Sequence, residues 1–264
     1  MTDKQRYLFD LQGFLIVENV LSDEQCEQAK ASIDERLHPM EKTPDGYDAK
    51  GTWHSAGGLM EAGEPFIGLI DHPAITDVLH GIIGKPLRLE SAYSFVRHRD
   101  CPPFEMHGGN KGGDPNFRYM VNNGRIHTGL TVVSFALQEV TQADGGFACV
   151  PGSHKSEMPL SKEDRREVMT FGGPLVQNVA TPKGSAVIFT ECLAHGANSW
   201  QRDEPRYGLF YKYNHRAAIY HCQENRRPSK AALEQMTPSQ RCYFNHAWQG
   251  FGPTASGAND EPEF

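Results

Sequence analysis

Residues 186–213 read AVIFTECLAHGANSWQRDEPRYGLFYKY, and this stretch predicts two β-strands with a loop between them. The mostly apolar run from Ala186 to Thr190 is typical of a strand. The run from 207 to 213 is rich in aromatic residues, which favour strands over helices. His195 follows the first strand and Arg206 opens the second, so both polar side chains are expected at strand ends.

The same signals recur along the chain and predict a protein built mainly of short strands. Leu87 to Arg97 fits a strand, and Thr128 to Leu137 is a stronger candidate. Two further strands are predicted at 147–150 and 176–179. Glycine and proline turns separate these segments, which favours a β-sandwich or jelly roll flanked by helices.

The N-terminal region carries helical patterns instead. A short helix is expected before the apolar run Phe14–Val17, which reads as a buried strand. Ser22 and Gln25 have the spacing of a capping box, in which each side chain accepts a hydrogen bond from the other's backbone N–H. A second helix is therefore expected from there to about Leu37.

Residues 38–60 are rich in glycine, proline and aspartate and are predicted to be a loop. A third helix is expected from Pro73 to Ile83, because proline is favoured at the first helical position and Gly84 follows as a terminator. The end of the chain, residues 250–264, has a composition typical of poor order.

We expect a single domain, since β-rich domains of ~200–250 residues are common. Its three parts are a helical N-terminal block (1–86), a jelly-roll core (87–220) and a C-terminal extension (221–264). A doubly wound nucleotide-binding fold is excluded, because the glycine pairs at 108–109 and 112–113 lie in a loop with no helical pattern after it.

The composition of the chain limits the classes of binding partner that we expect. The chain has 26 Lys and Arg against 33 Asp and Glu, a formal charge of −7, so nucleic acid and anionic membranes are not expected to bind. No apolar run approaches the ~20 residues of a membrane span, and no leader pattern is present. We therefore expect a soluble, cytoplasmic protein. The six cysteines form no CxxC pair, which argues against zinc ribbons and a disulfide framework.

Two of the twelve histidines stand out with one arginine. His107 precedes a pair of glycines, and His195 and Arg206 lie in the stretch quoted above. Histidines at two strand ends can both face the mouth of a jelly roll, where neutral imidazoles bind a metal ion. An inward arginine can hold a carboxylate through two hydrogen bonds. The pattern predicts a metal site with a neighbouring subsite for a keto acid.

At these residues the sequence resembles the phytanoyl-CoA dioxygenase-like branch of the Fe(II)/2-oxoglutarate oxygenases. The resemblance spans most of the chain, from Gly13–Val17 and the capped helix through Asp144–Phe147 to His195 and Arg206. Its most specific part is the run Val-Pro-Gly-Ser-His at 150–154.

The resemblance implies a double-stranded β-helix, or cupin-like jelly roll, that binds Fe(II) and 2-oxoglutarate. It implies that His107 and His195 are the iron ligands and that Arg206 pairs with the distal carboxylate of 2-oxoglutarate. The enzyme would then use O2 to oxidise an unactivated C–H bond of a small molecule.

Gly109 departs from the family pattern, which has a carboxylate residue two positions after the first histidine. Three hypotheses follow. In the first, chloride or bromide occupies the free coordination position and the enzyme halogenates its substrate, as in the radical halogenases that resemble this family. We favour this hypothesis slightly, because glycine removes the carboxylate without filling its space.

In the second hypothesis another acid replaces the missing ligand and the enzyme hydroxylates; the candidates are Asp114, Glu105 and Glu191. A hydroxylase with only the two histidines belongs to the same alternative. In the third hypothesis the site has decayed and the protein is a cupin-like binding module without turnover.

The substrate is expected to be small and polar or anionic, such as a carboxylate or a phosphate ester. The region that adjoins His107 contributes cationic and aromatic side chains. The candidates are Arg99, Lys111, Arg118, Tyr119 and Arg125, with Trp200 from the segment after His195. His154 is expected to bond to backbone in a turn, and no nucleophile elbow supports a hydrolase that would use Ser153.

Overall fold

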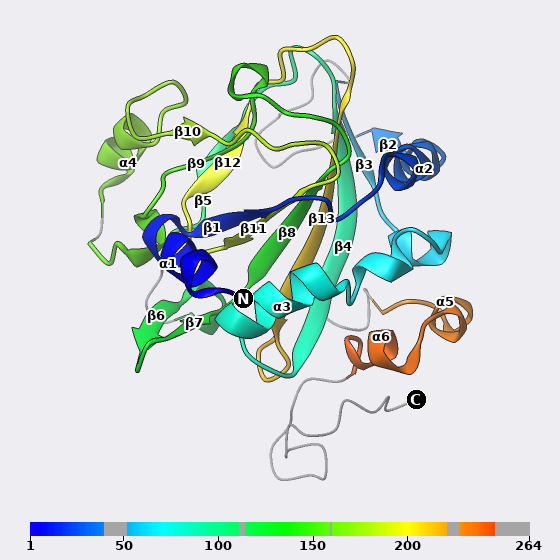
Figure 1. Cartoon of the computed structure of the whole chain (residues 1–264). Coiled ribbons are helices and arrows are strands. Elements are labelled where there is room, and N and C mark those ends of the chain that lie inside the picture. Colours follow the sequence, from blue (N-terminus) through cyan, green and yellow to red (C-terminus); the bar gives the residue numbers. More distant parts are fainter. Residues whose placement is uncertain (40–51, 111–113, 159, 221–226, 246–264) are drawn as a thin grey trace.

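The computed structural model describes residues 1–39, 52–110, 114–158, 160–220 and 227–245 of the 264-residue chain. Its core consists of a larger and a smaller antiparallel β-sheet that lie against each other, with helices around the larger one (Figure 1). The expected fold class is therefore confirmed: a mostly β protein with flanking helices and a cupin-like jelly-roll core.

The larger sheet has seven strands, each antiparallel to its neighbours. In spatial order they are β1 (Phe14–Val17), β11 (Ala186–Thr190), β8 (Thr131–Ala136), β13 (Arg206–His215), β4 (Leu87–Arg97), β3 (Trp53–Ala56) and β2 (His38–Pro39). The strands predicted at 87–97 and 186–190 have the predicted bounds. The strand predicted at 207–213 begins one residue earlier, so Arg206 is part of it.

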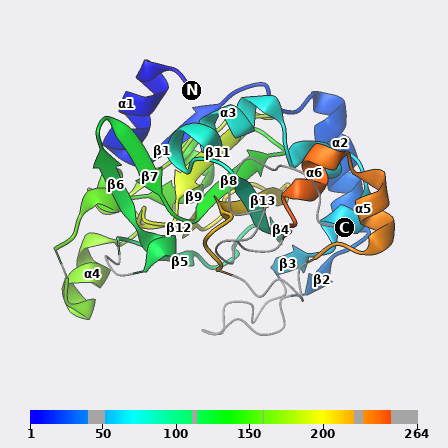
Figure 2. The same ribbon diagram turned by 90° about the horizontal axis from the view of Figure 1, so that it is seen from below.

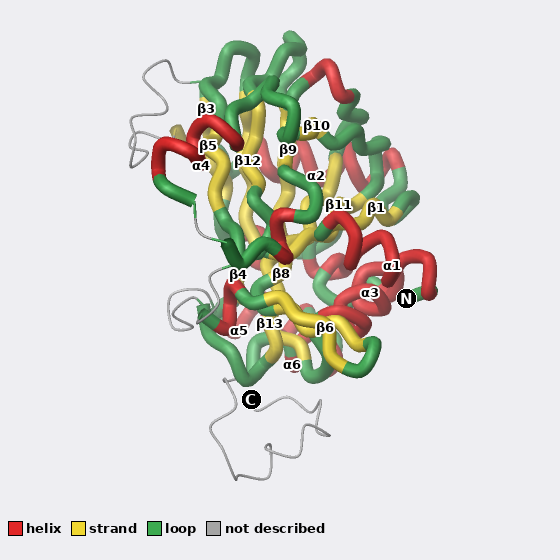
Figure 3. Tube along the Cα trace, turned by 90° about the vertical axis from the view of Figure 1, so that its left-hand side faces the viewer, coloured by secondary structure: helices red, strands yellow, loops and turns green. Residues whose placement is uncertain are grey.

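The smaller sheet carries the two histidines. Its strands are, in order, β10 (Gln177–Asn178), β9 (Gly146–Cys149), β12 (His195–Asn198) and β5 (Phe104–His107). Figure 3 shows β5, β12 and β9 alongside one another. A separate hairpin joins β6 (Tyr119–Asn122) to β7 (Arg125–Thr128). Strands β5 and β12 were not predicted. Each is only four residues long and includes polar residues, so neither forms an apolar run.

The side chains on the two faces of β11 belong to two different hydrophobic clusters. Val187 and Phe189 belong to an inner cluster between the sheets, where the rings of Phe189 and Phe147 lie 4.5 Å apart. Ala186 and Ile188 pack with the apolar residues of the helices instead. Because successive side chains of a strand point to opposite faces, a strand covered on both faces is apolar throughout.

The described part of the chain has six α-helices: α1 (Asp3–Gln12), α2 (Asp23–Asp34), α3 (Pro73–Ile82), α4 (Lys162–Val168), α5 (Lys230–Gln235) and α6 (Pro238–Cys242). Figure 2 shows α1, α2 and α3 on the side of the larger sheet that faces away from β5 and β12. The capping box of α2 is confirmed, since the Ser22 and Gln25 side chains accept hydrogen bonds from each other's backbone N–H. This helix ends at Asp34, three residues before the expected end.

Residues 38–60 are not the loop that their composition predicted. Strands β2 and β3 lie in this range, and Trp53 of β3 pairs with Arg97 of β4. The Trp53 ring also packs edge-on against Phe95, at 5.3 Å. Pairing with a neighbouring strand therefore outweighs local composition here. Residues 40–51 lie outside the described residues.

The part assigned to a helical block, residues 1–86, contributes β1, β2 and β3 to the larger sheet. The sheet therefore begins well before residue 87. Helices α5 and α6 belong to the C-terminal extension and were not predicted. The segment expected to be poorly ordered, 250–264, lies outside the described residues. Within the ranges that the structure describes, no helix has the length and the apolar character that a membrane crossing requires.

Candidate metal centre

His107 at the end of β5 and His195 at the start of β12 lie directly opposite each other in the smaller sheet. Their ring centroids are 4.1 Å apart. The Nδ1 atom of His107 lies 3.0 Å from the carbonyl oxygen of Glu105, and Nδ1 of His195 lies 2.7 Å from that of Leu193. A carbonyl oxygen only accepts hydrogen bonds, so each Nδ1 carries the proton and each Nε2 keeps its lone pair. This is the tautomer that binds metal ions through Nε2.

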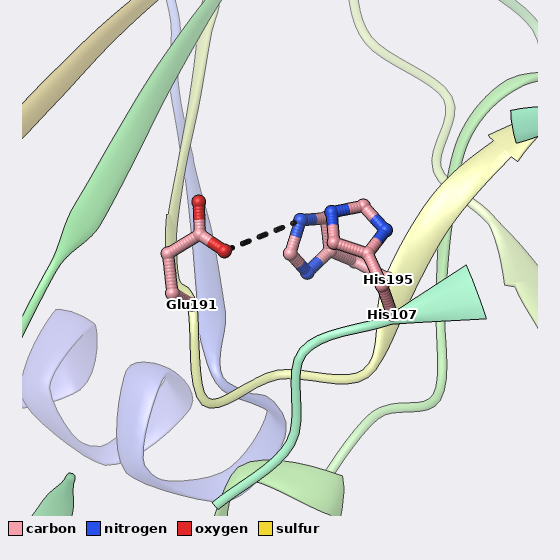
Figure 4. A group of neighbouring side chains, drawn as sticks. All are labelled: His107, Glu191 and His195. Carbon is pink, nitrogen blue, oxygen red and sulfur yellow. Dashed lines mark ion pairs between the residues drawn. The ribbon is translucent and has the colours of Figure 1, made fainter. Parts of the chain in front are cut away.

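Glu191 brings a carboxylate to the same place. It lies in the turn between β11 and β12, and its side chain points toward the two imidazole rings (Figure 4). One ring nitrogen of each histidine and one carboxylate oxygen lie within 4.8 Å of one another. The separation between Glu191 Oε2 and His195 Nε2 is 3.9 Å. Two imidazoles and a carboxylate are the donor set of non-haem Fe(II) oxygenases, so these residues fit an iron ion.

The other two candidate acids lie elsewhere. The Glu105 side chain is exposed on β5. The Asp114 carboxylate accepts hydrogen bonds from the backbone and side-chain nitrogens of Asn116, at 2.9 and 3.1 Å. Neither belongs to the group of metal-binding side chains found among the described residues.

Lys212 of β13 binds the second oxygen of Glu191, with 2.6 Å between Nζ and Oε1. Both side chains are largely buried. Burial raises the pKa of the Glu191 carboxyl, but the charge and hydrogen bond of Lys212, together with the neighbouring His195 and His107, outweigh burial and hold that pKa at about 2. Burial alone would lower the pKa of the lysine, whereas the Glu191 charge raises it. The carboxylate is therefore ionised at neutral pH.

The imidazoles remain neutral under the same conditions. Burial and, to a smaller extent, the nearby His107 lower the pKa of His195 to about 3, against the opposing charge of Glu191. Burial also lowers the pKa of His107. Neutral rings keep the Nε2 lone pairs that a metal ion requires.

Arg206 lies in the same cavity, at the start of β13. It is 7% exposed, and no carboxylate or carbonyl of the described residues accepts a hydrogen bond from it. Burial and the charge of Arg97 lower its pKa to about 10, so it remains a cation. Arg97 itself is engaged by Cys101 Sγ at 3.3 Å, by the Asn198 carbonyl oxygen at 3.1 Å and by the Pro102 carbonyl. Arg206 is thus the guanidinium that is available for an anion.

Aromatic residues form the walls of this cavity between the two sheets: Trp53, Tyr93, Phe95, Phe104, Phe147, Phe189 and Phe210. A second cavity, of about 580 Å³, lies beside the first, with Tyr93 in the lining of both. Its lining includes Ser91, whose buried hydroxyl has no hydrogen-bond partner among the described residues, together with Tyr220 and Phe244. Cavities of several hundred Å³ are the usual size of small-molecule sites.

Gly109 lies at the edge of the metal group and has a φ of +101°. A Cβ atom at this position would be 3.6 Å from Nη1 of Arg165. Arg165, from α4, also donates a hydrogen bond to the Gly108 carbonyl oxygen, at 3.1 Å. At this edge the protein therefore offers a guanidinium instead of a carboxylate.

The residues expected to contact substrate do not line the cavity of the histidines. Arg99 forms an exposed ion pair with Asp203. The Tyr119 hydroxyl donates to Asp10, and the Trp200 indole donates to the Glu204 carbonyl oxygen, both at 2.7 Å. Arg118 and Arg125 are exposed around the β6–β7 hairpin, and Lys111 lies outside the described residues. Pairing within the fold thus engages Arg99, Tyr119 and Trp200, whereas Arg118 and Arg125 are exposed on or beside the hairpin.

Sequence reasoning missed Lys212. Arg206, Gly208, Phe210 and Lys212 alternate along β13, so all four belong to one face of the strand. This spacing could have placed Lys212 in the cavity together with Arg206. The prediction for His154 is confirmed: this buried residue has its Nε2 atom 3.1 Å from the Asp10 carbonyl oxygen.

A jelly roll that encloses two imidazoles, a carboxylate and a buried guanidinium in one cavity is typical of the non-haem iron oxygenases. The sequence model of the phytanoyl-CoA dioxygenase (PhyH) family matches residues 9–208. This match covers most of the chain, which therefore belongs to that family of Fe(II)/2-oxoglutarate oxygenases.

Individual relatives are more distant. The chain is 25% identical to the dioxygenase lolE1 of Epichloe uncinata over 165 residues, which are 59% of this chain and 57% of the relative. Among solved structures, HygX of Streptomyces hygroscopicus with nickel and 2-oxoglutarate bound has a TM-score of 0.70 at 23% identity, over 81% of this chain and 87% of HygX. The carbocyclase SnoK from nogalamycin biosynthesis has a TM-score of 0.63 at 18% identity, over 95% and 94% of the two chains. At these identities the two structures support the fold.

Proposed function

We propose that this protein is an Fe(II)- and 2-oxoglutarate-dependent oxygenase that uses O2 to oxidise a C–H bond of a small polar or anionic molecule. One observation carries the proposal. Two imidazoles, each with Nδ1 held by a backbone carbonyl oxygen and Nε2 left free of a proton, line a cavity that also contains Arg206, a buried cation to which the described residues offer no acceptor.

Each of these residues has a definite task. His107 and His195 would hold the iron through Nε2, with the rings fixed by their bonds to backbone carbonyls. Arg206 would pair with the distal carboxylate of 2-oxoglutarate, because a guanidinium binds a carboxylate through two parallel hydrogen bonds. The aromatic walls keep bulk water from these groups. When bound, iron and 2-oxoglutarate supply the O2 activation and hydrogen abstraction that side chains cannot.

The relatives support this assignment of cofactors. HygX structures contain iron in one case and nickel with 2-oxoglutarate in another. The epimerase SnoN is described as α-ketoglutarate-dependent and has been solved with Fe3+. We place the substrate in the neighbouring 580 Å³ cavity, since its Ser91 hydroxyl and its aromatic residues suit a polar molecule with an apolar part.

Halogenation of the same C–H bond is the second candidate function. Gly109 favours it, because the carboxylate of the family pattern is absent and the Arg165 guanidinium beside it could attract chloride. Mass spectrometry of the product separates the two outcomes: hydroxylation inserts one oxygen atom, and halogenation replaces one hydrogen with chlorine. The same product in chloride-free buffer would exclude halogenation.

The direct test is an anaerobic titration of the Fe(II)-loaded protein with 2-oxoglutarate, followed by exposure to O2. We expect a visible charge-transfer band on binding and succinate after O2 is admitted. Arg206→Met should require far more 2-oxoglutarate for the same band. A folded protein that shows neither band nor succinate would instead be a cupin-like binding module.

A further inference from the structure

We propose that Glu191 supplies the third protein ligand of the metal ion, in place of the carboxylate that is absent at position 109, and that Lys212 holds Glu191 in position. This inference rests on the proposed iron site. It adds a metal ligand that lies four residues before the second histidine instead of two residues after the first.

Position 109 is poorly suited to provide a carboxylate ligand. Its backbone φ of +101° is one that residues with side chains rarely adopt. The space beside its Cα contains the positive Arg165 guanidinium. A carboxylate from this position would be strained and would be attracted to Arg165, so the third anionic ligand is expected from another segment.

Backbone contacts bring Glu191 close to the two histidines. The Glu191 backbone N–H donates to the Leu130 carbonyl oxygen at 2.9 Å, which fixes the turn after β11. Gly108 lets the segment after His107 approach this turn: a Cβ at Gly108 would lie 2.6 Å from the carbonyl oxygens of both Glu191 and Leu193. The close packing that glycine permits brings the two ligand-bearing segments together.

The lone pairs of Glu191 and His195 face each other. Oε2 of Glu191 and Nε2 of His195 are 3.9 Å apart, and the His195 proton is on Nδ1, which lies 2.7 Å from the Leu193 carbonyl oxygen. None of the described residues donates a hydrogen bond to Oε2. One ring nitrogen of His107 belongs to the same group. Three electron-pair donors that converge in one place suit a cation between them.

Lys212 occupies one oxygen of Glu191. Its ammonium group binds Oε1 at 2.6 Å, which leaves Oε2 for a metal ion. A lysine on one oxygen therefore favours binding through the other. It also balances the buried carboxylate before the metal arrives, since an unpaired buried charge is strongly destabilising.

The test uses cobalt(II) as a spectroscopic probe, added to the metal-free full chain with 2-oxoglutarate under nitrogen. Binding is followed by the visible cobalt absorption and by calorimetry. We expect Glu191→Gln to weaken cobalt binding at least about tenfold and to change the absorption spectrum. Glu157→Gln is the control: its carboxylate is exposed and lies outside the metal group, and we expect binding within about twofold of wild type.

The positioning role of Lys212 is tested by the cobalt absorption spectrum of its variants. Lys212→Arg keeps a cation on Oε1, so we expect it to retain the cobalt spectrum of the wild type. Lys212→Met frees Oε1, so we expect a changed spectrum. A Lys212→Met protein that is folded and has the wild-type spectrum would overturn the positioning role.

Folding is controlled with the double variant Glu191→Leu, Lys212→Met, which removes both charges and leaves no ion unpaired. We expect the double variant to fold and to lose cobalt affinity as the single variant does. Folded Glu191 variants that bind cobalt like the wild type would overturn the inference, as would a wild-type cobalt spectrum that depends on chloride. If the wild type itself binds no cobalt, the proposed iron site fails, and this inference fails with it.

Discussion

The two chain segments that meet at the candidate metal centre differ in their surroundings. The segment of His107 ends the strand β5, is partly exposed and continues into two glycines with positive φ. The segment of His195 follows the buried strand β11, and its imidazole is 6% exposed between the rings of Phe189 and Phe147. Glu191 belongs to this second segment, and its partner Lys212 comes from the larger sheet. Most of the fixed groups of the site therefore depend on the larger sheet, and β5 adds one imidazole.

The largest effect is expected from the histidines. His107→Ala and His195→Ala should each lower cobalt affinity at least about 100-fold, because each removes a ligand. The two variants should differ in their free energy of unfolding. His195→Ala opens a cavity among aromatic rings and should cost about 2–3 kcal/mol, whereas His107→Ala should cost about 1 kcal/mol or less. Urea unfolding of the metal-free variants measures this difference, and equal losses would contradict the contrast between the segments.

Substitution of Arg206 should have the next largest effect. It should weaken the binding of 2-oxoglutarate alone. Arg206→Met removes the cation that would bind the distal carboxylate, and we expect the Kd for 2-oxoglutarate to rise about 100-fold, or about 3 kcal/mol. Arg206→Lys keeps the charge without the planar fork and should recover part of this loss. Arg202→Met, a partly exposed arginine before β13, is the control. An unchanged Kd in the Arg206 variants would remove Arg206 from the site.

His154 allows a test outside the metal centre. Burial lowers its pKa to about 4, below the ordinary value of 6.5. The unfolded chain therefore binds the proton first, and stability falls as the pH drops from about 6.5 toward 4. Between pH 7 and pH 5 this residue should account for about 2 kcal/mol of that fall. His154→Gln has no proton to take up, so its unfolding free energy should change less over the same range. A slope equal to that of the wild type would contradict the assignment.

Gly109→Asp should have the smallest effect on metal binding. The aspartate is strained at a φ of +101°, which should cost about 1–2 kcal/mol of stability. Arg165 would attract the new carboxylate, so cobalt affinity should remain within about threefold of wild type. A large gain in affinity would mean that position 109 faces the ion after all, and the contrast between the two segments would then be weaker.

Sequence reasoning identified the parts of the fold that local chemistry dictates. The apolar run of β11 and the capping box of α2 could be read directly, because burial on two faces and reciprocal capping leave clear patterns. Strand β3 was missed, since its conformation depends on pairing with β4, which is more than thirty positions away in sequence. Strands β5 and β12 were missed because they carry the two histidines of the site and therefore lack the apolar run of a core strand.

The candidate site shows the same limit. Two histidines and one arginine could be selected from the sequence because the resemblance to a family gives their order along the chain. Glu191 was one of three acids that spacing could not separate, and only the packing around Gly108 distinguishes it. Arg99 and Tyr119 were attractive as charged or aromatic residues near His107, but long-range pairs with Asp203 and Asp10 engage them elsewhere.

The most direct measurement is anomalous diffraction from crystals of the full chain grown with Mn(II) and 2-oxoglutarate. We expect one manganese ion bound by His107, His195 and Glu191, with the distal carboxylate of 2-oxoglutarate on Arg206. An ion bound by the two histidines alone, with chloride or water beside Gly109 and Glu191 in contact only with Lys212, would contradict the account.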